Sequence, residues 1–179
     1  TNYLVLWPDS EHHLFEPNPK FYPVLQVKTD GKPNVFVNGF GLGDKEEVRA
    51  YYEPLQAFVG SGSAPDDATS HMRLPIKTLG QYIKEKDIKQ IDFLKIDAEG
   101  HDIKVIVGAY NFRHNIKFIQ YESWGEHNNK MIKGLLQDEF EILNVGYRNM
   151  FCMNKELVSQ EERARLREYI EANKLAELV

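Results

Sequence analysis

Acidic residues gather where a strongly apolar segment of the sequence ends. The segment Ile91–Ile96 is almost continuously apolar, which is typical of a strand buried on both faces in a parallel sheet, and Asp97, Glu99 and Asp102 follow it. Gly100 permits a sharp turn at this point, and apolar residues recur at helical spacing afterwards. Ligands of open α/β sheets bind beyond the carboxyl ends of the strands. The spacing therefore predicts that these carboxylates border a binding crevice.

Two other predicted strands also lead into a glutamate. The strand His12–Phe15 runs into Glu16, where prolines stop extended pairing, and the strand Ile116–Tyr121 runs into Glu122. A carboxylate at such a strand end in a nucleotide-binding α/β fold accepts hydrogen bonds from ribose hydroxyls. Glu16 is therefore a candidate for that role, with a solvated turn residue or a helix N-cap as the alternative.

Three short motifs, taken in order, resemble those of a known family. Residues Leu14–Pro19 read L-F-E-P-N-P, residues Lys95–Asp102 read K-I-D-A-E-G-H-D with Gly108-Ala109 after them, and Gln120–Glu122 reads Q-Y-E. They resemble the F-E-P-N-P motif, the K-I-D-x-E-G-x-[ED] plus G-A signature and the later strand ending in Glu of the FkbM family of S-adenosylmethionine-dependent methyltransferases. The resemblance covers Leu14 to Met153.

The resemblance implies a fold that the apolar pattern also supports. We expect an α/β protein with a Rossmann-like class I methyltransferase sheet, helices on both faces, and a closing antiparallel hairpin from Phe140–Leu143 and Met150–Met153. Thr78 is a candidate N-cap for a helix that buries Leu79, Tyr82 and Ile83. We expect residues 1–158 to form the methyltransferase-like domain. Residues 159–179 then form a charged helix packed on it or extending from it, which could contact a second copy.

The cofactor that the resemblance implies is S-adenosylmethionine. Glu16 and Asn18 of the first motif, together with Asp97, are the expected cofactor-binding residues beyond the strand ends. Glycines alternate in the segment Asn38–Asp44, but the spacing of a phosphate-binding loop is absent. The resemblance instead places this segment beside the adenine, where Phe40 or Leu42 would pack on the ring.

Methyl transfer to a hydroxyl requires an aligned acceptor and a group that takes its proton. Grouped carboxylates suit this work because close like charges in a partly buried site raise a pKa toward neutrality. We expect Asp97 and Glu122 to act as the site carboxylates and Glu99 to orient a neighbour or bind an acceptor hydroxyl. His101 or His127 is the next candidate base.

The acidic residues also have structural and metal-binding explanations. Capping of the following helix, with complementarity to its dipole, accounts for carboxylates at this position without any catalytic role. A divalent cation between Asp97 and Glu122 is a minor alternative, which the spacing does not require. The histidines lack the spacing of zinc ligands, and we predict no metal site.

The sequence departs from the family pattern at two places. Gly80 stands where the family usually has Asp, so this chain lacks that carboxylate. The glycine-rich loop D-x-G-A-x-x-G, and the central strand before it, do not precede Glu16. That strand would lie between the strands His12–Phe15 and Ile91–Ile96, and its absence would leave backbone groups unpaired. We expect an incomplete amino end, with Thr1–Trp7 as the helix after the lost loop; the alternative is a degenerate domain without cofactor.

Composition narrows the class of protein. The 179 residues suffice for one domain, and 42% hydrophobic and 27% charged residues are globular values. The net charge of −5 makes nucleic acid an unlikely partner, and no segment is long and apolar enough to span a membrane. The single Cys152 lies in an apolar run and suits a buried thiol in a reducing compartment. With no signal peptide visible, we expect a soluble cytoplasmic protein.

The sequence therefore predicts a methyltransferase that methylates a hydroxyl of a small molecule or glycan, such as a sugar or secondary metabolite. The acceptor class rests on the family resemblance alone. The alternative from another class is a catalytically silent, methyltransferase-like module for binding or assembly. The segment Gly60–Asp67 is expected to be a flexible loop, and it could form a flap over the substrate.

Overall fold

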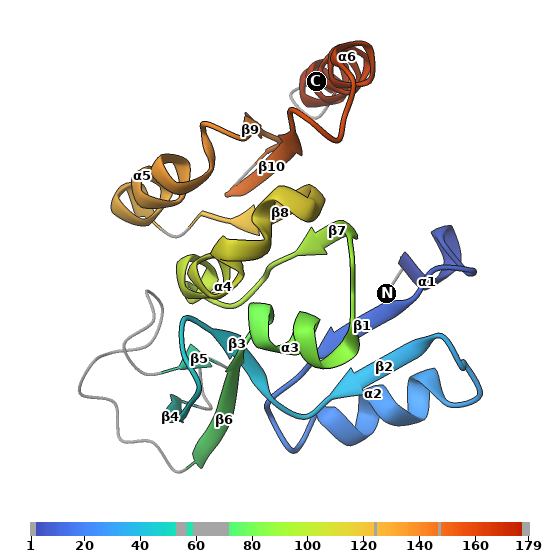
Figure 1. The fold of residues 1–179 in the computed structure, drawn as a ribbon, viewed down its shortest axis with the longest axis vertical. Helices are drawn as coiled ribbons and strands as arrows, with labels where there is room; N and C mark the ends of the chain where they lie inside the picture. The colour runs from blue at the N-terminus through green and yellow to red at the C-terminus, as the bar shows by residue number, and fades with distance from the viewer. Residues whose placement is uncertain (1–2, 53–56, 59–71, 124, 147, 177–179) are drawn as a thin grey trace.

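The computed structural model describes residues 3–52, 57–58, 72–123, 125–146 and 148–176 (Figure 1). The first half of the chain contains α1 (Tyr3–Leu6), β1 (His12–Phe15), α2 (Tyr22–Thr29), β2 (Val35–Asn38), β3 (Gly41–Gly43), β4 (Glu47–Tyr52), β5 (Ala57–Phe58), β6 (Met72–Thr78) and α3 (Leu79–Lys86). The second half contains β7 (Ile91–Lys95), α4 (Asp102–Ala109), the 3₁₀ helix η2 (Tyr110–Asn115), β8 (Ile116–Glu122), α5 (Gly125–Leu136), β9 (Phe140–Asn144), β10 (Asn149–Asn154) and α6 (Gln160–Ala176). The predicted loop Gly60–Asp67 lies outside the described residues.

The described strands form three sheets, whereas the sequence predicted a single Rossmann-like sheet. Strands β1 and β2 pair in parallel, β7-β8-β10-β9 form a mixed sheet, and β3-β6-β4-β5 form a second mixed sheet. The α/β class is confirmed, but the continuous sheet is not observed. The sheet is interrupted between β1 and β7, because within the described residues β1 pairs only with β2 and β7 pairs only with β8.

The two parallel pairs have the same direction. In Figure 1, β1, β2 and β7 all run from the right of the view toward the left, and β8 is parallel to β7 by its register. The carboxyl ends of these four strands therefore point toward the same side of the molecule. The candidate carboxylates were predicted from the sequence to lie at these strand ends.

The sheet β3-β6-β4-β5 was largely missed from the sequence. The segment Gly41–Gly43, for which no strand was predicted, is a strand parallel to β6. Strand β6 contains Pro75, which has no N–H for the ladder and disguises the strand in the sequence. The segment Glu47–Tyr52 forms β4, which pairs with both β5 and β6.

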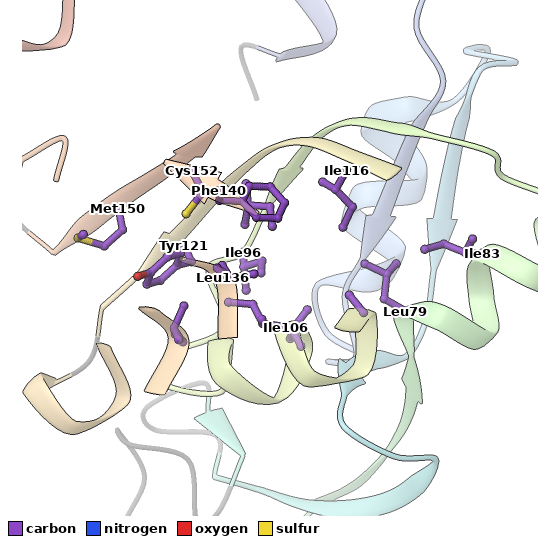
Figure 2. Packing of buried hydrophobic residues seen from close by; sticks show 14 of the residues in the cluster. Leu79, Ile83, Ile96, Ile106, Ile116, Tyr121, Leu136, Phe140, Met150 and Cys152 are labelled. Carbon is purple, nitrogen blue, oxygen red and sulfur yellow. The ribbon is translucent and has the colours of Figure 1, made fainter. Parts of the chain in front are cut away.

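The main core lies between β7-β8-β10-β9 and the helices α3, α4 and α5, and Figure 2 shows its packing. Its fully buried members include Ile116, Tyr121, Leu136 and Cys152. Burial raises the pKa of the Cys152 thiol to about 12, so this residue is a structural thiol, as predicted.

Strand β7 is less buried than the sequence suggested. Asp92 is exposed and Phe93 is half-buried, although burial of both faces was expected. The ring of Phe93 lies near those of Tyr3 and Trp7, at centroid distances of 5.5 and 6.0 Å, and near no other aromatic ring among the described residues. The prediction of a fully buried strand was wrong because the described residues cover one face of β7 only in part, with the rings of Tyr3 and Trp7.

Several local predictions are confirmed. The hydroxyl of Thr78 accepts the N–H of Gln81 and caps α3, which buries the three predicted residues. The predicted hairpin is β9 and β10, and β10 also pairs with β8. In α6, Tyr169 is 69% exposed. No helix among the described residues has the length and apolar character needed to cross a membrane.

Candidate functional site

The turn between β7 and α4 carries the central acidic motif. Strand pairing continues to Ile96, whose N–H bonds the carbonyl of Gln120 at 2.7 Å. Glu99 then adopts a φ of 49° and Gly100 a φ of 84°. The left-handed region is uncommon for a residue with a side chain, and strained residues of this kind cluster at functional sites.

Asp97, Glu99 and Glu122 lie close enough to influence one another. Burial raises the pKa of Glu99, and the negative charges of Glu122 and Asp97 raise it further, while Arg148 acts in the opposite direction. Asp97 is largely exposed, and its Oδ2 forms an ion pair with Lys95 Nζ at 3.0 Å. The structure therefore brings together the three carboxylates that the sequence selected from two separate strand ends.

Asp102 belongs to the same group through a direct contact. Its Oδ1 accepts the backbone N–H of Glu122 at 3.0 Å. The residue is 2% exposed, and burial raises its pKa to about 6, against the opposing effect of nearby backbone N–H groups. The four acidic side chains thus form one cluster at the carboxyl ends of β7 and β8.

His101 lies on a different side of the turn from this cluster. It is 1% exposed, its ring is 5.2 Å from that of Phe58 in β5, and a Cβ on Gly43 would lie 3.2 Å from its Nε2. Burial lowers its pKa to about 4, so the ring is neutral at physiological pH. These contacts favour a packing role over the predicted role as a base. His127, the other candidate, is exposed in α5.

Glu16 follows β1 directly and holds the next turn. Its Oε1 accepts the N–H of Asn18 at 2.8 Å, and Asn18 Oδ1 in turn accepts the N–H of Lys20. Asn18 is fully buried, and its Nδ2 has no hydrogen-bond partner in the part of the chain that the structure describes. One oxygen of Glu16 is thus engaged, while Oε2 makes no bond to a described residue. An acceptor and a donor beside one strand end fit the hydroxyls of a ribose.

The two predicted adenine-packing residues lie beyond β2. The ring of Phe40 contacts those of Phe15 and Tyr82, at centroid distances of 5.7 and 6.0 Å, and Lys77 Nζ lies 5.3 Å from it. Leu42 is half-buried in β3. Both pack against the main core, and their contact with a cofactor stays a prediction.

The flanking glycines of this segment have a packing function of their own. A Cβ on Gly41 would meet the Phe58 ring at 3.0 Å, and one on Gly43 would meet Ile76 at 2.8 Å. Protein side chains therefore fill the space that these glycines leave.

Sequence reasoning missed Arg148. This residue precedes β10, and its charge acts on Glu99 because β10 pairs with β8. Nothing in the local sequence indicates this contact, because it depends on the insertion of β10 between β8 and β9. Among the described residues, no group of three His, Cys, Asp or Glu side chains could hold a metal ion.

Comparison with known proteins places this arrangement in a family. The model of the methyltransferase FkbM domain matches residues 5–148. The chain belongs to this family. A search of curated proteins gives no match. The FkbM match includes all four acidic residues of the cluster and the turn after β1.

A solved structure supports the FkbM fold. The crystal structure of methyltransferase FkbM from Methylobacillus flagellatus KT is similar, with a TM-score of 0.53 and 14% sequence identity. The alignment covers 80% of this chain and 36% of that chain, so this chain spans little more than a third of the length of the solved protein. At this identity the likeness bears on the fold alone.

Proposed function

We propose that the protein is an S-adenosylmethionine-dependent methyltransferase that methylates a hydroxyl group of a sugar or secondary metabolite. The observation that carries this proposal is the convergence of Asp97, Glu99 and Glu122 at the ends of two adjacent parallel strands, in a chain of the FkbM family. Carboxylates grouped in this way can bind an acceptor hydroxyl and take its proton. A cytoplasmic location suits the single buried cysteine.

The residues that would hold the cofactor lie beyond β1 and β2. Glu16 Oε2 and Asn18 Nδ2 offer an acceptor and a donor to the ribose hydroxyls, and Phe40 and Leu42 offer apolar surface to the adenine. S-adenosylmethionine supplies the methyl group when bound. The remaining requirement falls on the chain itself, which must align the acceptor oxygen and remove its proton.

The acidic cluster meets this requirement in two ways. Glu122 and Asp97 offer carboxylate oxygens that accept the hydroxyl proton as the acceptor oxygen is methylated. Burial and the neighbouring negative charges raise the pKa of Glu99, which favours its protonated form, and a protonated carboxyl group can donate a hydrogen bond to a second acceptor oxygen. A polyhydroxylated acceptor would use both kinds of contact.

We also propose that an additional parallel strand fits between β1 and β7. Within the described residues each of these strands has one paired edge, and both run in the same direction. A strand between them would join β2-β1 and β7-β8-β10-β9 into one sheet, at the position where the family resemblance places the strand before the glycine-rich loop. Residue-resolved amide exchange tests this: if every second amide of β1 and β7 exchanges freely, no strand occupies the position.

Calorimetric titration with S-adenosylhomocysteine, on the protein as its gene encodes it, tests the cofactor assignment. Binding with a Kd in the micromolar range, on the order of −8 kcal/mol, is the expected result. Absence of both heat and a thermal shift would contradict it. That result would favour the second candidate function, a silent module for binding or assembly. The supporting observation is that one edge of β1 and one edge of β7 pair with no described strand.

A further inference from the structure

The carboxyl group of Asp102 connects the turn after β7 to the end of β8. Its Oδ1 accepts the N–H of Glu122 at 3.0 Å, although the two residues lie far apart in the chain. The side chain is 2% exposed, and Oδ2 has no hydrogen-bond partner among the described residues. Burial of a carboxyl group with one unpaired oxygen is unfavourable. The backbone N–H groups of Glu122, Asp102 and Ala98 oppose this cost by stabilising the charged carboxylate, so the contact joins the two segments at a buried position.

This hydrogen bond lies where the two acidic segments meet. Asp102 is the first residue of α4, directly after the turn that carries Glu99, and Glu122 is the last residue of β8. The ladder bond from the Ile96 N–H to the Gln120 carbonyl precedes it along the two segments. The side chain of Asp102 thus extends the connection between the strands by one step, to the residue whose carboxylate faces Glu99.

We propose that Asp102 is a positioning residue that holds the Glu122 carboxylate beside Glu99, so that the carboxyl groups of Glu122 and Glu99 can contact the same acceptor group. The proposal rests on the proposed methyltransferase function and deepens it, because it names what fixes the geometry of the acceptor site. Asp102 does not touch the acceptor in this arrangement. It acts through the backbone of Glu122.

The strength of this connection depends on protonation. A carboxylate accepts a stronger hydrogen bond than a carboxylic acid does. The ionisable groups near Asp102 are Asp97 on the preceding turn and Tyr121 and Glu122 on β8, with Glu99 beyond Glu122. Burial raises the pKa of Asp102 to about 6, so the contact weakens as the pH falls through that value.

The amide of Glu122 reports on this contact directly. In Asp102→Ala we expect hydrogen exchange at the Glu122 amide to accelerate by about tenfold or more, because a bond to a charged acceptor is lost. In Asp102→Asn a neutral oxygen acceptor is kept, so the acceleration should be smaller than in Asp102→Ala. Asp92→Asn, at an exposed position on β7, is the matched control and should change nothing.

A pH titration separates positioning from a purely structural role. The amide shift of Glu122 should titrate with a midpoint near 6 in the unchanged protein and in Asp92→Asn, and should be flat near that pH in Asp102→Asn. If Asp102→Ala fails to fold, the comparison of the unchanged protein with Asp102→Asn still tests the role of Asp102. Persistence of the same titration in Asp102→Asn, or its absence from the unchanged protein, overturns the proposal.

The experiments on the Glu122 amide test the role of Asp102 separately from the binding of S-adenosylmethionine. A folded protein that binds S-adenosylhomocysteine but shows no response at Glu122 would refute the role of Asp102 and leave the proposed function intact. A titrating Glu122 amide in a protein without cofactor affinity would support the contact and refute the methyltransferase proposal.

Discussion

A Cβ atom on Gly108 would lie 2.0 Å from the carbonyl oxygen of Gly43, so α4 packs against β3 with no room for a side chain. Gly80 of α3 takes part in the same contact, because a Cβ there would lie 3.0 Å from the carbonyl oxygen of Gly108. Three elements therefore meet at three glycines. This explains the glycine of the Gly108-Ala109 motif, and it also accounts for Gly80, where the family usually has Asp: any side chain would require α3 and α4 to move apart.

The first prediction follows from this contact. We expect Gly108→Ala to lower the free energy of unfolding by about 3 kcal/mol or more, because the new methyl group meets a backbone atom that cannot rotate away. Gly134→Ala is the matched control, since it is also a helical glycine but its Cβ would meet nothing within 4 Å. That change should stabilise the protein by about 0.5–1 kcal/mol. Urea denaturation of both variants measures the difference, and equal effects would contradict the packing argument.

The elements nearest the site were predictable because local patterns determine them. The apolar run before Asp97 and the Thr78 cap depend on neighbours in sequence, and both are confirmed as β7 and α3. The nearness of Glu122 to Glu99 was also foreseen, since adjacent parallel strands end at one edge of a sheet.

The parts that were missed depend on contacts between distant segments. Strand β6 contains a proline, and β3 consists of glycines around one leucine, so neither resembles a strand by composition. The burial of His101 under Phe58 could not be predicted without that sheet. The contribution of Arg148 likewise required the pairing of β10 with β8.

The second prediction concerns Glu16. In Glu16→Gln the amide oxygen can still accept the Asn18 N–H, so the turn after β1 should keep its structure. The charged acceptor for a ribose hydroxyl is lost, however, and we expect the Kd for S-adenosylhomocysteine to rise about tenfold. Glu46→Gln, at an exposed position between β3 and β4, should leave the Kd unchanged. Calorimetry on the three proteins decides, and an unaltered Kd in Glu16→Gln would remove Glu16 from the cofactor site.

The third prediction concerns the charges around Glu99. Removing the negative charge in Glu122→Gln should lower the pKa of Glu99, because the neighbouring charge no longer opposes its ionisation. Glu126→Gln is the control, since Glu126 does not contribute to that shift. A carboxyl-carbon NMR titration of Glu99 measures both. If the pKa of Glu99 is the same in Glu122→Gln as in the control, the two carboxylates are not neighbours in solution.

The fourth prediction is that His101 and Asp102, adjacent in the chain, make opposite contributions to the pH dependence of stability. The pKa of Asp102 is raised from 3.8 to about 6, so its contribution is present below about pH 4 and is lost as the pH rises through 6. The pKa of His101 is lowered from 6.5 to about 4, so its contribution is present above pH 6.5 and is lost as the pH falls through 4. Each amounts to about 3 kcal/mol at most, and the two largely cancel over the same range.

Substitution of either residue should reveal the contribution of the other to the pH dependence of stability. Relative to the unchanged protein, Asp102→Asn should gain stability as the pH rises from about 4 to about 7, because it no longer ionises a buried carboxyl group. His101→Gln should instead gain relative stability as the pH falls over that range, because it no longer protonates a buried ring. Urea denaturation at several pH values gives both differences. Slopes of the same sign would show that at least one of the two groups is not buried in solution as the structure places it.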